Sequence, residues 1–455
     1  MKENTLDTIV SLCKRRGFIF QAGELYGGLA GFFDYGPLGS LLKNNIKDLW
    51  LEKFVHSRTD MFLLDSAIVM GEKPLTASGH VGGFSDPLVS DSKTGKEYRA
   101  DHILEEAGTN PENMTLDQMA QAIFDHKILS PDGNTLGGVR EFNLMLKTQL
   151  GSSSDSSATA YLRPETAQGI FVNYKNIMDS MHPKLPFGVG QIGKAYRNEI
   201  TPRNFIFRLR ELEQMEIEYF INPKDWKEQF EYWKDQVNEW CELIGLDMTK
   251  LHEVEIEGAD RAHYSERTID FEFEYPFGQK ELCGLAYRAD YDLKKHAEHS
   301  KTKLQYTDDA LGETFVPHVI EPSMGLDRTL LAILVSAYKE DEVNGEVRSY
   351  LSLNPAIAPY KIAVSPLLKN KPELVAKAQE IFSMLKKEFG NVVFDDNGNI
   401  GKRYRRQDEI GTPFCVVIDF DSLEDSAVTI RNRDTTDQER VSIDGLIDWM
   451  NTKLN

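Results

Sequence analysis

The sequence predicts a multidomain protein, in which an α+β region of antiparallel strands flanked by helices precedes a compact α/β domain of roughly 100 residues. Two strand-like segments between residues 187 and 220, joined by a turn at 201–204, predict an antiparallel hairpin in the first region. Alternating strand and helix patterns beyond Pro355 and Pro359 predict the second. The chain has 455 residues, 41% of them hydrophobic and 27% charged, which is enough apolar content for two or more packed cores.

The bulk composition excludes several classes of protein. A formal net charge of −20 argues against a protein that coats nucleic acid nonspecifically, because phosphate binding requires concentrated positive potential. There is no run of roughly 18 apolar residues and no apolar N-terminal stretch, so we expect no membrane partner and a cytoplasmic location. The cysteines lie far apart, so we expect reduced thiols and no zinc site.

The N-terminal region begins with two expected helices. Apolar residues from Leu6 to Cys13 recur at helical spacing, and this helix should end before Gly17. A glycine-rich stretch, 23–39, follows, and Pro37 then opens a longer amphipathic helix. Its apolar stripe consists of Leu38, Leu41, Leu42, Ile46, Leu49, Trp50 and Phe54. Taken alone, such a stripe indicates core packing.

Two polar segments interrupt the strand pattern of the N-terminal region. Residues from about 86 to 150 are charged and rich in turn signals, so we interpret them as an insertion, followed by a flexible serine-rich loop at 151–159. A second, helical insertion is expected from about 223 to 268. Strands should resume at 268–275, 281–288 and 314–320, before a helix at 326–338.

The C-terminal domain is expected to span residues 356–455, after a first domain of residues 1–355. Its predicted strands are 360–364, 392–394, 414–420 and 427–430. Its predicted helices are one stopped by Gly390, a basic helix near 402–406, and a last one at 446–454. A basic helix can also be simply a solvated surface.

The predicted hairpin carries the most informative side chains. Because side chains alternate along a strand, Arg197 and Glu199 should point to one side. Across the turn, a second shared face is expected for Arg208, Arg210, Leu212, Gln214 and Glu216. Arginines followed by acids suit the floor of a polar cleft that holds phosphate oxygens and an amino group. The alternative is a solvated face with cross-strand ion pairs.

A family resemblance favours the cleft. The segment Gln-Ile-Gly-Lys-Ala-Tyr-Arg-Asn-Glu-Ile at 191–200, together with Phe-Arg-Leu-Arg-Glu at 207–211, resembles motif 2 of class II aminoacyl-tRNA synthetases, in the form typical of the glycyl enzymes. The resemblance implies that Arg197 holds the α-phosphate of ATP, Glu199 meets the adenine amino group and Arg208 reaches the γ-phosphate. Leu212 stands where the family commonly has phenylalanine, so adenine stacking there should be weaker or supplied by another group.

Two further segments match the same family. Gly-Pro-Leu-Gly at 36–39, with its helix, resembles motif 1 near 34–60, which implies a homodimer and makes the apolar stripe an expected subunit interface. Gly-Leu-Asp-Arg at 325–328 resembles motif 3, at about 321–338, in which Arg328 would clamp the γ-phosphate. A helix N-terminus already favours anions, so an arginine there adds to a positive field.

Specificity for glycine follows from its lack of a side chain. Recognition must use acids around the ammonium and a pocket too small for a methyl group, so no editing domain is required. Glu165, Glu216, Glu321 and Ser323 match the residues that do this in glycyl-tRNA synthetases. Taken singly, each glutamate is more typical of a surface or N-cap residue, and it is their joint occurrence in three family motifs that favours the binding role. Arg99 also matches a substrate-binding position.

The resemblance therefore implies a ligase that uses ATP with Mg²⁺ to activate glycine and transfers it to the 3′ end of tRNA(Gly). Catalysis is assigned to Arg197, Arg208 and Arg328, and the metal ion to Glu281. The expected ATP-binding residues are Arg197, Asn198, Glu199, Phe207, Arg208, Leu209, Arg210, Glu211, Leu212, Glu281, Leu282, Gly325, Leu326, Asp327 and Arg328. The expected glycine-binding residues are Arg99, Glu165, Leu212, Glu213, Gln214, Met215, Glu216, Glu321, Pro322, Ser323, Met324 and Gly325.

The C-terminal domain resembles the anticodon-binding domain shared by the glycyl, prolyl, threonyl and histidyl enzymes. Single-stranded bases are read by stacking and edge contacts beside cations that bind the backbone. The expected tRNA-binding residues are Lys402, Arg403, Tyr404, Arg405, Arg406, Arg431 and Arg433.

Two rival functions remain at this point. A class II synthetase for serine, threonine or proline would need other groups than glutamates 165, 216 and 321 in its pocket. A non-catalytic relative, such as the processivity subunits of mitochondrial DNA polymerase, should have lost the ATP arginines, yet Arg197, Arg208 and Arg328 are all present.

Overall fold

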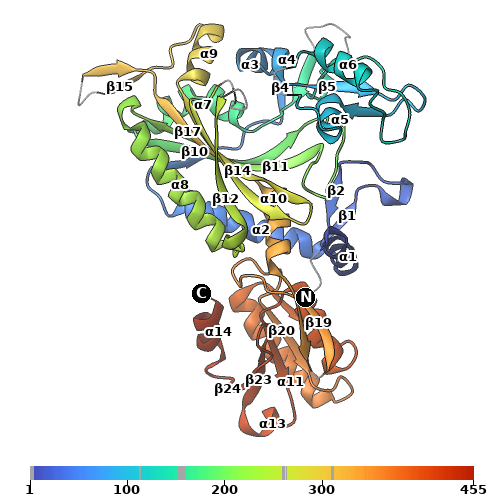
Figure 1. Cartoon of the computed structure of the whole chain (residues 1–455). Coiled ribbons are helices and arrows are strands. Elements are labelled where there is room, and N and C mark those ends of the chain that lie inside the picture. Colours follow the sequence, from blue (N-terminus) through green and yellow to red (C-terminus); the bar gives the residue numbers. More distant parts are fainter. Residues whose placement is uncertain are drawn as a thin grey trace.

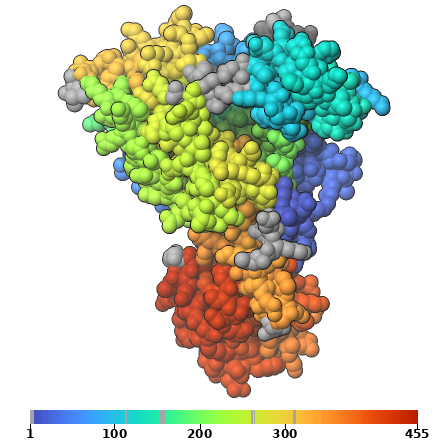
Figure 2. Space-filling model, in the orientation of Figure 1, coloured from blue at the N-terminus to red at the C-terminus, as the bar shows by residue number. Residues whose placement is uncertain are grey.

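The computed structural model describes residues 5–111, 114–151, 159–258, 262, 264–308, 312–343 and 345–454. It shows a broad N-terminal body around a seven-stranded sheet and a smaller C-terminal body around a five-stranded sheet (Figure 1). Each body has its own apolar core, and the outline narrows between them (Figure 2). The predicted order, an antiparallel region followed by an α/β domain, is confirmed. Within the described ranges, no helix has the length and apolar content needed to cross a membrane.

The central sheet is almost entirely antiparallel. Its strands, in spatial order, are β12 (Leu251–Ile256), β13 (Arg267–Tyr275), β14 (Gly278–Ala289), β17 (His318–Gly325), β11 (Glu211–Ile221), β10 (Phe187–Tyr196) and β3 (Met61–Leu63). Only the β3–β10 pair is parallel. The β11–β17 register places Glu216 opposite Ser323, so residues 107 positions apart in the chain become neighbours.

Two helices fill the core on one side of this sheet. Helix α10 (Leu326–Ala337) starts where β17 ends and is buried along nearly its whole length. Helix α2 (Pro37–Leu51) packs against it, and Leu42, Ile46 and Trp50 have no exposed surface. The stripe of α2 thus lies in the core of its own chain, and its assignment to a subunit interface is wrong.

The segment 223–268 belongs to the central body rather than to an insertion. Helix α8 (Trp226–Leu243) lies along the sheet and buries Trp233 and Trp240 in the main core. Strand β12 then pairs with β13 and forms one edge of the sheet. The polar composition of this segment reflects the outer faces of an amphipathic helix and an edge strand.

Residues 86–150 do form a separate small module beside the sheet (cyan in Figure 1). Strands β5 (Ser85–Ser90), β6 (Glu97–Arg99) and β7 (Arg140–Asn143) are covered by helices α5 (Ala100–Glu106) and α6 (Leu116–Asp125), which share an apolar cluster. Next to it lie β4 (Val69–Gly71), α3 (Glu72–Ala77), α4 (His80–Gly83), β8 (Lys147–Gln149) and β9 (Thr159–Leu162). Most of the expected serine-rich loop, residues 152–158, lies outside the described residues.

The N-terminus and the outer helices complete this body. Helix α1 (Leu6–Arg16) ends at Gly17, whose φ of 75° suits glycine. Strands β1 (Ile19–Gln21) and β2 (Phe33–Tyr35) are joined by a projecting loop that contains the short helix η1 (Glu24–Tyr26). Helices α7 (Ala167–Met181) and α9 (Tyr291–Ser300) pack on the other face of the sheet, near the small hairpin β15 (Tyr306–Asp308) and β16 (Glu313–Phe315).

The C-terminal sheet combines parallel and antiparallel pairs. Strands β21 (Val392–Phe394), β20 (Ile362–Pro366) and β22 (Phe414–Ile418) are parallel, and β23 (Ala427–Asn432) and β24 (Gln438–Ser442) continue the sheet antiparallel. Its helices are α11 (Pro372–Phe389), α12 (Ile400–Ile410), α13 (Ser422–Asp425) and α14 (Leu446–Leu454). The sequence pattern missed β24 and the hairpin of β18 (Tyr338–Val343) and β19 (Glu346–Leu351), whose strands are largely polar.

Buried arginines join the two bodies. Arg348 on β19 forms ion pairs with Asp341 and with Asp408 of α12. Arg433, after β23, donates to the carbonyl of Leu353 at 3.0 Å and to that of Gly411 at 2.7 Å. These charge-assisted bonds tie the C-terminal domain to the end of the N-terminal body.

Candidate active site

A cleft with a volume of about 270 Å³ opens over strands β11, β14 and β17. It brings together most of the residues expected to bind ATP and glycine, although they come from five separate segments of the chain. The expected residues that line it are Glu165, Arg197, Glu199, Phe207, Arg208, Leu209, Leu212, Glu213, Gln214, Glu216, Glu281, Leu282, Glu321, Ser323, Gly325, Asp327 and Arg328.

Several expected residues do not line the cleft. Met215 and Met324 point into the main core, because alternate residues of a strand face opposite sides and the expectation covered continuous segments. Leu326, the first residue of α10, is buried in the same core. Also outside it are Asn198, Arg210, Glu211 and Pro322. Arg210 instead donates to the carbonyls of Glu199 and Ala30.

Arg99 also stands apart from the cleft walls. It lies at the end of β6 in the small module, where its guanidinium pairs with Asp86 at 2.7 Å and with Asp101 at 2.6 Å. Burial raises the pKa of Asp86 to about 6, although Arg99 opposes the shift. In this arrangement Arg99 is held by its own module.

The two phosphate-binding candidates of motif 2 lie on a loop. Strand β10 ends at Tyr196 and β11 begins at Glu211, so Arg197 and Arg208 occupy the connection between them and not the strand faces that the pattern predicted. Arg197 Nε donates to the carbonyl of Pro164 at 3.0 Å, which anchors the side chain beside Glu165. The alternation is correct for Leu212, Gln214 and Glu216, which lie on β11 and line the cleft.

Arg208 and Glu199 face each other across this loop. Their closest charged atoms, Nη1 and Oε2, are 3.8 Å apart. Burial lowers the pKa of Arg208 against the opposing effect of Glu199. Glu199 Oε2 is buried and has no hydrogen-bond partner among the residues that the structure describes. An orphaned carboxylate oxygen of this kind suits a ligand's N–H group.

Arg328, in the first turn of α10, forms the other side of the cleft. Its Nη1 donates to Glu281 Oε2 at 2.9 Å and to the carbonyl of Glu281 at 3.1 Å. The guanidinium carbon lies 4.3 Å from the centre of the Phe207 ring, within cation–π range. Phe207 therefore supplies an aromatic surface in the cleft, although Leu212 does not.

Two carboxylates in this part of the cleft could hold a divalent cation. Glu281 has its pKa lowered, mainly by the charge of Arg328. Asp270, on β13, also lines the cleft, and burial followed by the charges of Glu281 and Glu272 raises its pKa to about 7. Oxygen ligands are those that Mg²⁺ prefers, so the donor set fits this ion. No sequence motif surrounds Asp270. Its place in the cleft follows from the pairing of β13 with β14.

The other end of the cleft is lined by acids. Glu165 precedes α7, Glu216 is on β11 and Glu321 is on β17. Glu216 accepts hydrogen bonds from Ser323 Oγ at 2.9 Å and from the hydroxyl of Thr166. Three expected glycine-binding residues, Glu216, Glu321 and Ser323, thus meet where β11 pairs with β17.

Basic and amide groups hold two of these acids from outside the cleft. Glu321 Oε1 accepts from Arg288 Nη1 at 2.8 Å, and Arg288 is itself paired with Asp292. Glu165 lies 3.4 Å from His80 Nε2 and accepts from Gln168 Nε2 at 3.0 Å. No local sequence motif identifies His80, Arg288 and Asp292, because these residues reach the acids only through the tertiary fold.

The acids differ in their pKa values. Burial raises the pKa of Glu321 to about 8, against the opposing charge of Arg288. Burial and the neighbouring Glu165 raise the pKa of Glu216. Burial also opposes ionisation of Glu165, but the charge and hydrogen bond of His80, with smaller contributions from Arg288 and Gln168, lower its pKa. The chamber therefore has more acidic groups than basic groups to balance them.

The expected anticodon-binding residues divide into two groups. Arg403, Arg431 and Arg433 are only 2–5% exposed, so their assignment as tRNA ligands is corrected. Arg403 donates to backbone carbonyls and Arg431 binds Asp408 with two hydrogen bonds, which explains their burial. The other four residues, Lys402, Tyr404, Arg405 and Arg406, keep exposed surface on α12.

Comparison with known proteins identifies the family of the chain. Residues 150–337 match the family described as "tRNA synthetase class II core domain (G, H, P, S and T)", and residues 361–453 match the "Anticodon binding domain" family. The glycine–tRNA ligase of Caldanaerobacter subterraneus subsp. tengcongensis is 48% identical over 99% of this chain and 98% of its own length. Those of Clostridium acetobutylicum and Bacillus anthracis are 48% and 47% identical, each over 99% of both chains. The chain therefore belongs to the glycine–tRNA ligase family of class II aminoacyl-tRNA synthetases.

Proposed function

We propose that the protein activates glycine with ATP and joins it to tRNA(Gly). The observation that carries this proposal is the joining, in one cleft, of an acid-lined chamber with a group of arginines at a helix N-terminus and on the motif 2 loop. The acids suit a small ammonium-bearing substrate, and the arginines suit a triphosphate.

The first step is formation of glycyl-adenylate. The glycine carboxylate oxygen attacks the α-phosphorus of ATP, the bond from this phosphorus to the bridging oxygen breaks, and pyrophosphate leaves. Arg197 would stabilise charge on the α-phosphate, and Arg208 and Arg328 charge on the leaving group. The carboxylate is already ionised, so the step needs no strong general base.

Glycine would be recognised by its ammonium group and by its size. Glu216 and Glu321 present carboxylate oxygens to the chamber, and Ser323 fixes the orientation of Glu216. Glu165 would be a third acid of the chamber. It lies beside Arg197, because this arginine is anchored to the carbonyl of the preceding residue, Pro164. A rigid wall excludes a larger amino acid at a greater free-energy cost than unfilled space, so we expect discrimination against alanine and serine.

Phe207 and Glu199 would hold the adenine of ATP. The Phe207 ring supplies a stacking surface, and the unpaired Glu199 Oε2 can accept from the adenine amino group. Mg²⁺ held by Glu281, with Asp270 nearby, would neutralise charge on the phosphates. Arg328 forms an ion pair with Glu281 in this structure, so the Arg328 side chain must turn toward the nucleotide when ATP binds.

In the second step the 3′-hydroxyl of the terminal tRNA ribose would attack the activated carbonyl, and AMP would leave. The C-terminal domain would read the anticodon through α12, where Lys402 is exposed and Tyr404, Arg405 and Arg406 are half-buried. Tyr404 would be a stacking surface, and the three basic residues would lie near the RNA backbone, with Arg406 also paired with Asp395. The domains would divide between Ala358 and Ile362, a few residues after the expected boundary at 355, since Ala358 packs in the first core and Ile362 in the second. A cytoplasmic location fits a role in supplying charged tRNA.

A homodimer is also proposed, on a surface other than the stripe of α2. Leu25 and Tyr26, on the loop between β1 and β2, are 95% and 94% exposed, and Leu29 is 55% exposed. Apolar side chains that project in this way are typical of a segment that packs on another chain. They lie close in sequence to motif 1, from which the dimer was expected.

Exchange of labelled pyrophosphate into ATP tests the first step. The wild-type protein should catalyse this exchange with glycine and not with alanine or serine at the same concentration. Robust exchange with serine would contradict the proposed specificity. Absence of exchange with any amino acid, in protein that is folded and binds ATP, would contradict the activity itself.

A further inference from the structure

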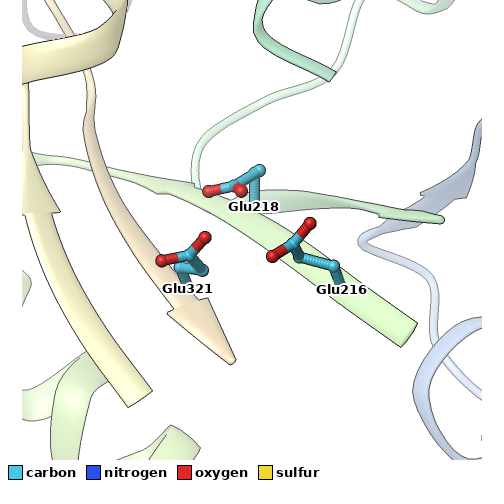
Figure 3. A group of neighbouring side chains, drawn as sticks. All are labelled: Glu216, Glu218 and Glu321. Carbon is cyan, nitrogen blue, oxygen red and sulfur yellow. The ribbon is translucent and has the colours of Figure 1, made fainter. Parts of the chain in front are cut away.

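Arg197 is held in place differently from the buried glutamates of the central sheet. Glu216, Glu218 and Glu321 project from the paired strands β11 and β17, which fix their positions (Figure 3). Arg197 lies just beyond the end of β10, on the motif 2 loop. Its Nε donates to the Pro164 carbonyl at 3.0 Å, and among the described residues its Nη1 and Nη2 have no hydrogen-bond partner. One hydrogen bond does not fix so flexible a side chain, and a preorganised guanidinium needs a second restraint.

The ring of Phe84 supplies a second contact for this guanidinium. The guanidinium carbon of Arg197 lies 5.4 Å from the centre of the ring, within the range of a cation–π interaction. Phe84 is half-buried and stands between α4 and β5. A carboxylate at this place would compete with phosphate for the guanidinium donors. An aromatic ring restrains the guanidinium and leaves Nη1 and Nη2 free to donate to phosphate oxygens.

Backbone hydrogen bonds join Phe84 to the motif 2 loop. The carbonyl of Phe84 accepts from the Leu144 amide at 3.0 Å, and the carbonyl of Leu144 accepts from the Asn198 amide at 2.7 Å. Asn198 is the residue that follows Arg197. Leu144 therefore links the two segments through its backbone, and this link keeps the ring beside the guanidinium.

The same ring also contacts a residue at the acid end of the cleft. The ring centres of Phe84 and His80 are 5.3 Å apart, and His80 Nε2 lies 3.4 Å from a carboxylate oxygen of Glu165. Glu165 directly follows Pro164, whose carbonyl anchors Arg197. These contacts close a ring that begins and ends at the arginine, and Phe84 occupies the side that no motif of the sequence marks.

We propose that Phe84 is a positioning residue for Arg197, and that its ring holds the guanidinium in the orientation that meets the α-phosphate of ATP. This role rests on the proposed function. It gives the small module a part in the first step, because strand β5 of that module begins with the residue after Phe84.

The variant Phe84→Leu removes the ring and keeps an apolar side chain. With saturating glycine and ATP, the kcat of pyrophosphate exchange should fall about three- to tenfold, as expected for the loss of one cation–π contact. The KM for glycine should change by less than about twofold, because Ser78 also holds His80, with Oγ 2.7 Å from Nδ1. Phe84→Tyr keeps the ring face and should retain most of the wild-type kcat.

A double-mutant cycle with Arg197 separates positioning from packing. Arg197→Ala has no guanidinium for the ring to hold, so adding Phe84→Leu to it should cause no further loss of kcat. Phe84 also packs against a small apolar cluster, so the thermal midpoint of each variant is measured alongside. A loss of kcat by the same factor in both backgrounds would show that the ring acts only through the fold, and would overturn the proposal.

The matched control is Phe124→Leu, on α6 of the small module. It makes the same change in a side chain that is 77% exposed, and should leave kcat and both KM values unchanged. If Phe84→Leu does not fold, Phe84→Met, whose longer side chain fills more of the space, replaces it in both backgrounds.

The outcomes separate this inference from the proposed function. If the wild-type protein shows no glycine-dependent exchange, the proposed function fails, and the role of Phe84 fails with it. If the wild type exchanges with glycine and Phe84→Leu has the wild-type kcat, only the role of Phe84 fails.

Discussion

At the residue scale, the cleft contains charged side chains whose hydrogen-bonding atoms are only partly paired. Arg197 is anchored through Nε to the Pro164 carbonyl, and Glu199 has a buried oxygen without a partner in the described structure. The cost of such groups is recovered only when a ligand with matching charges binds. The proposed function therefore assigns the arginines to the nucleotide end of the cleft and the buried glutamates to the amino acid end.

Replacement of Arg197 by alanine should reduce glycine-dependent pyrophosphate exchange by about 100- to 1000-fold, because a preorganised donor to the reacting phosphate is lost. Steady-state exchange kinetics measure the loss, which should appear mainly in kcat. The exposed Arg140, paired with Glu97 in the small module, provides the control, and Arg140→Ala should exchange at the wild-type rate. Equal rates for Arg197→Ala and the wild type would contradict the assigned role.

The KM for glycine should fall as the pH is raised from 6.5 to 8.5. Burial raises the pKa of Glu321 to about 8, and only its ionised form attracts an ammonium. The sign for stability is opposite: the unfolded chain ionises near the ordinary value of 4.5, so this group disfavours the glycine-free fold increasingly from there up to about 8. Exchange kinetics across this range provide the check. A KM independent of pH in the wild type would exclude this role for Glu321.

At the scale of elements, the pairing of β11 with β17 positions the acids of the proposed glycine site. Their antiparallel register places Ser323 opposite Glu216, and alternation along β11 brings Leu212, Gln214, Glu216 and Glu218 to one side. The rigid sheet centre keeps the acids close together despite their mutual repulsion. A shift in register of one residue would turn these side chains into the core.

Helix α8 should be essential for the stability of the central body. Trp233 is fully buried against Phe54 and Tyr219, so Trp233→Ala should cost about 3–5 kcal/mol of unfolding free energy. The control on the same helix is Tyr232→Ala, whose side chain is 38% exposed and which should cost about 1 kcal/mol or less. Chemical denaturation of both variants measures the difference. A small loss for Trp233→Ala would mean that α8 is the peripheral insertion first expected.

The sequence predicted local elements better than their tertiary roles. The helix ended by Gly17 and the helix opened by Pro37 have the expected boundaries, because caps are local signals. Segment 223–268 was misassigned, since a polar outer face conceals a helix whose inner face carries Trp233. In the cleft, the motifs located Arg197 but not Asp270. Asp270 reaches the cleft through the pairing of β13 with β14, which no contiguous motif records.

At the scale of the whole molecule, two bodies with separate cores must cooperate on one tRNA. Buried ionic contacts hold them together: Arg348 reaches Asp408, and Arg433 reaches the Leu353 carbonyl. Arginines that seemed available for tRNA, such as Arg431, are used for structure instead. The proposed function therefore leaves Lys402, Tyr404, Arg405 and Arg406, the expected residues of α12 that keep some exposed surface, for contact with tRNA.

The projecting loop between β1 and β2 should control assembly. Replacing both Leu25 and Tyr26 by aspartate should convert a dimer into monomers at micromolar concentration, because two charges would be buried at the contact. Sedimentation equilibrium measures the mass, and the thermal midpoint should change little, since these side chains barely contact their own chain. A double variant that remains as dimeric as the wild type would place the interface elsewhere.

The most direct test is a crystal structure with a non-hydrolysable analogue of glycyl-adenylate. The account predicts the glycyl ammonium within hydrogen-bond distance of Glu216 and Glu321, and the group that replaces the α-phosphate beside Arg197. An ammonium bound away from these carboxylates, or an adenylate that Arg197 does not reach, would contradict the central claim that one cleft joins the acid chamber to the nucleotide site.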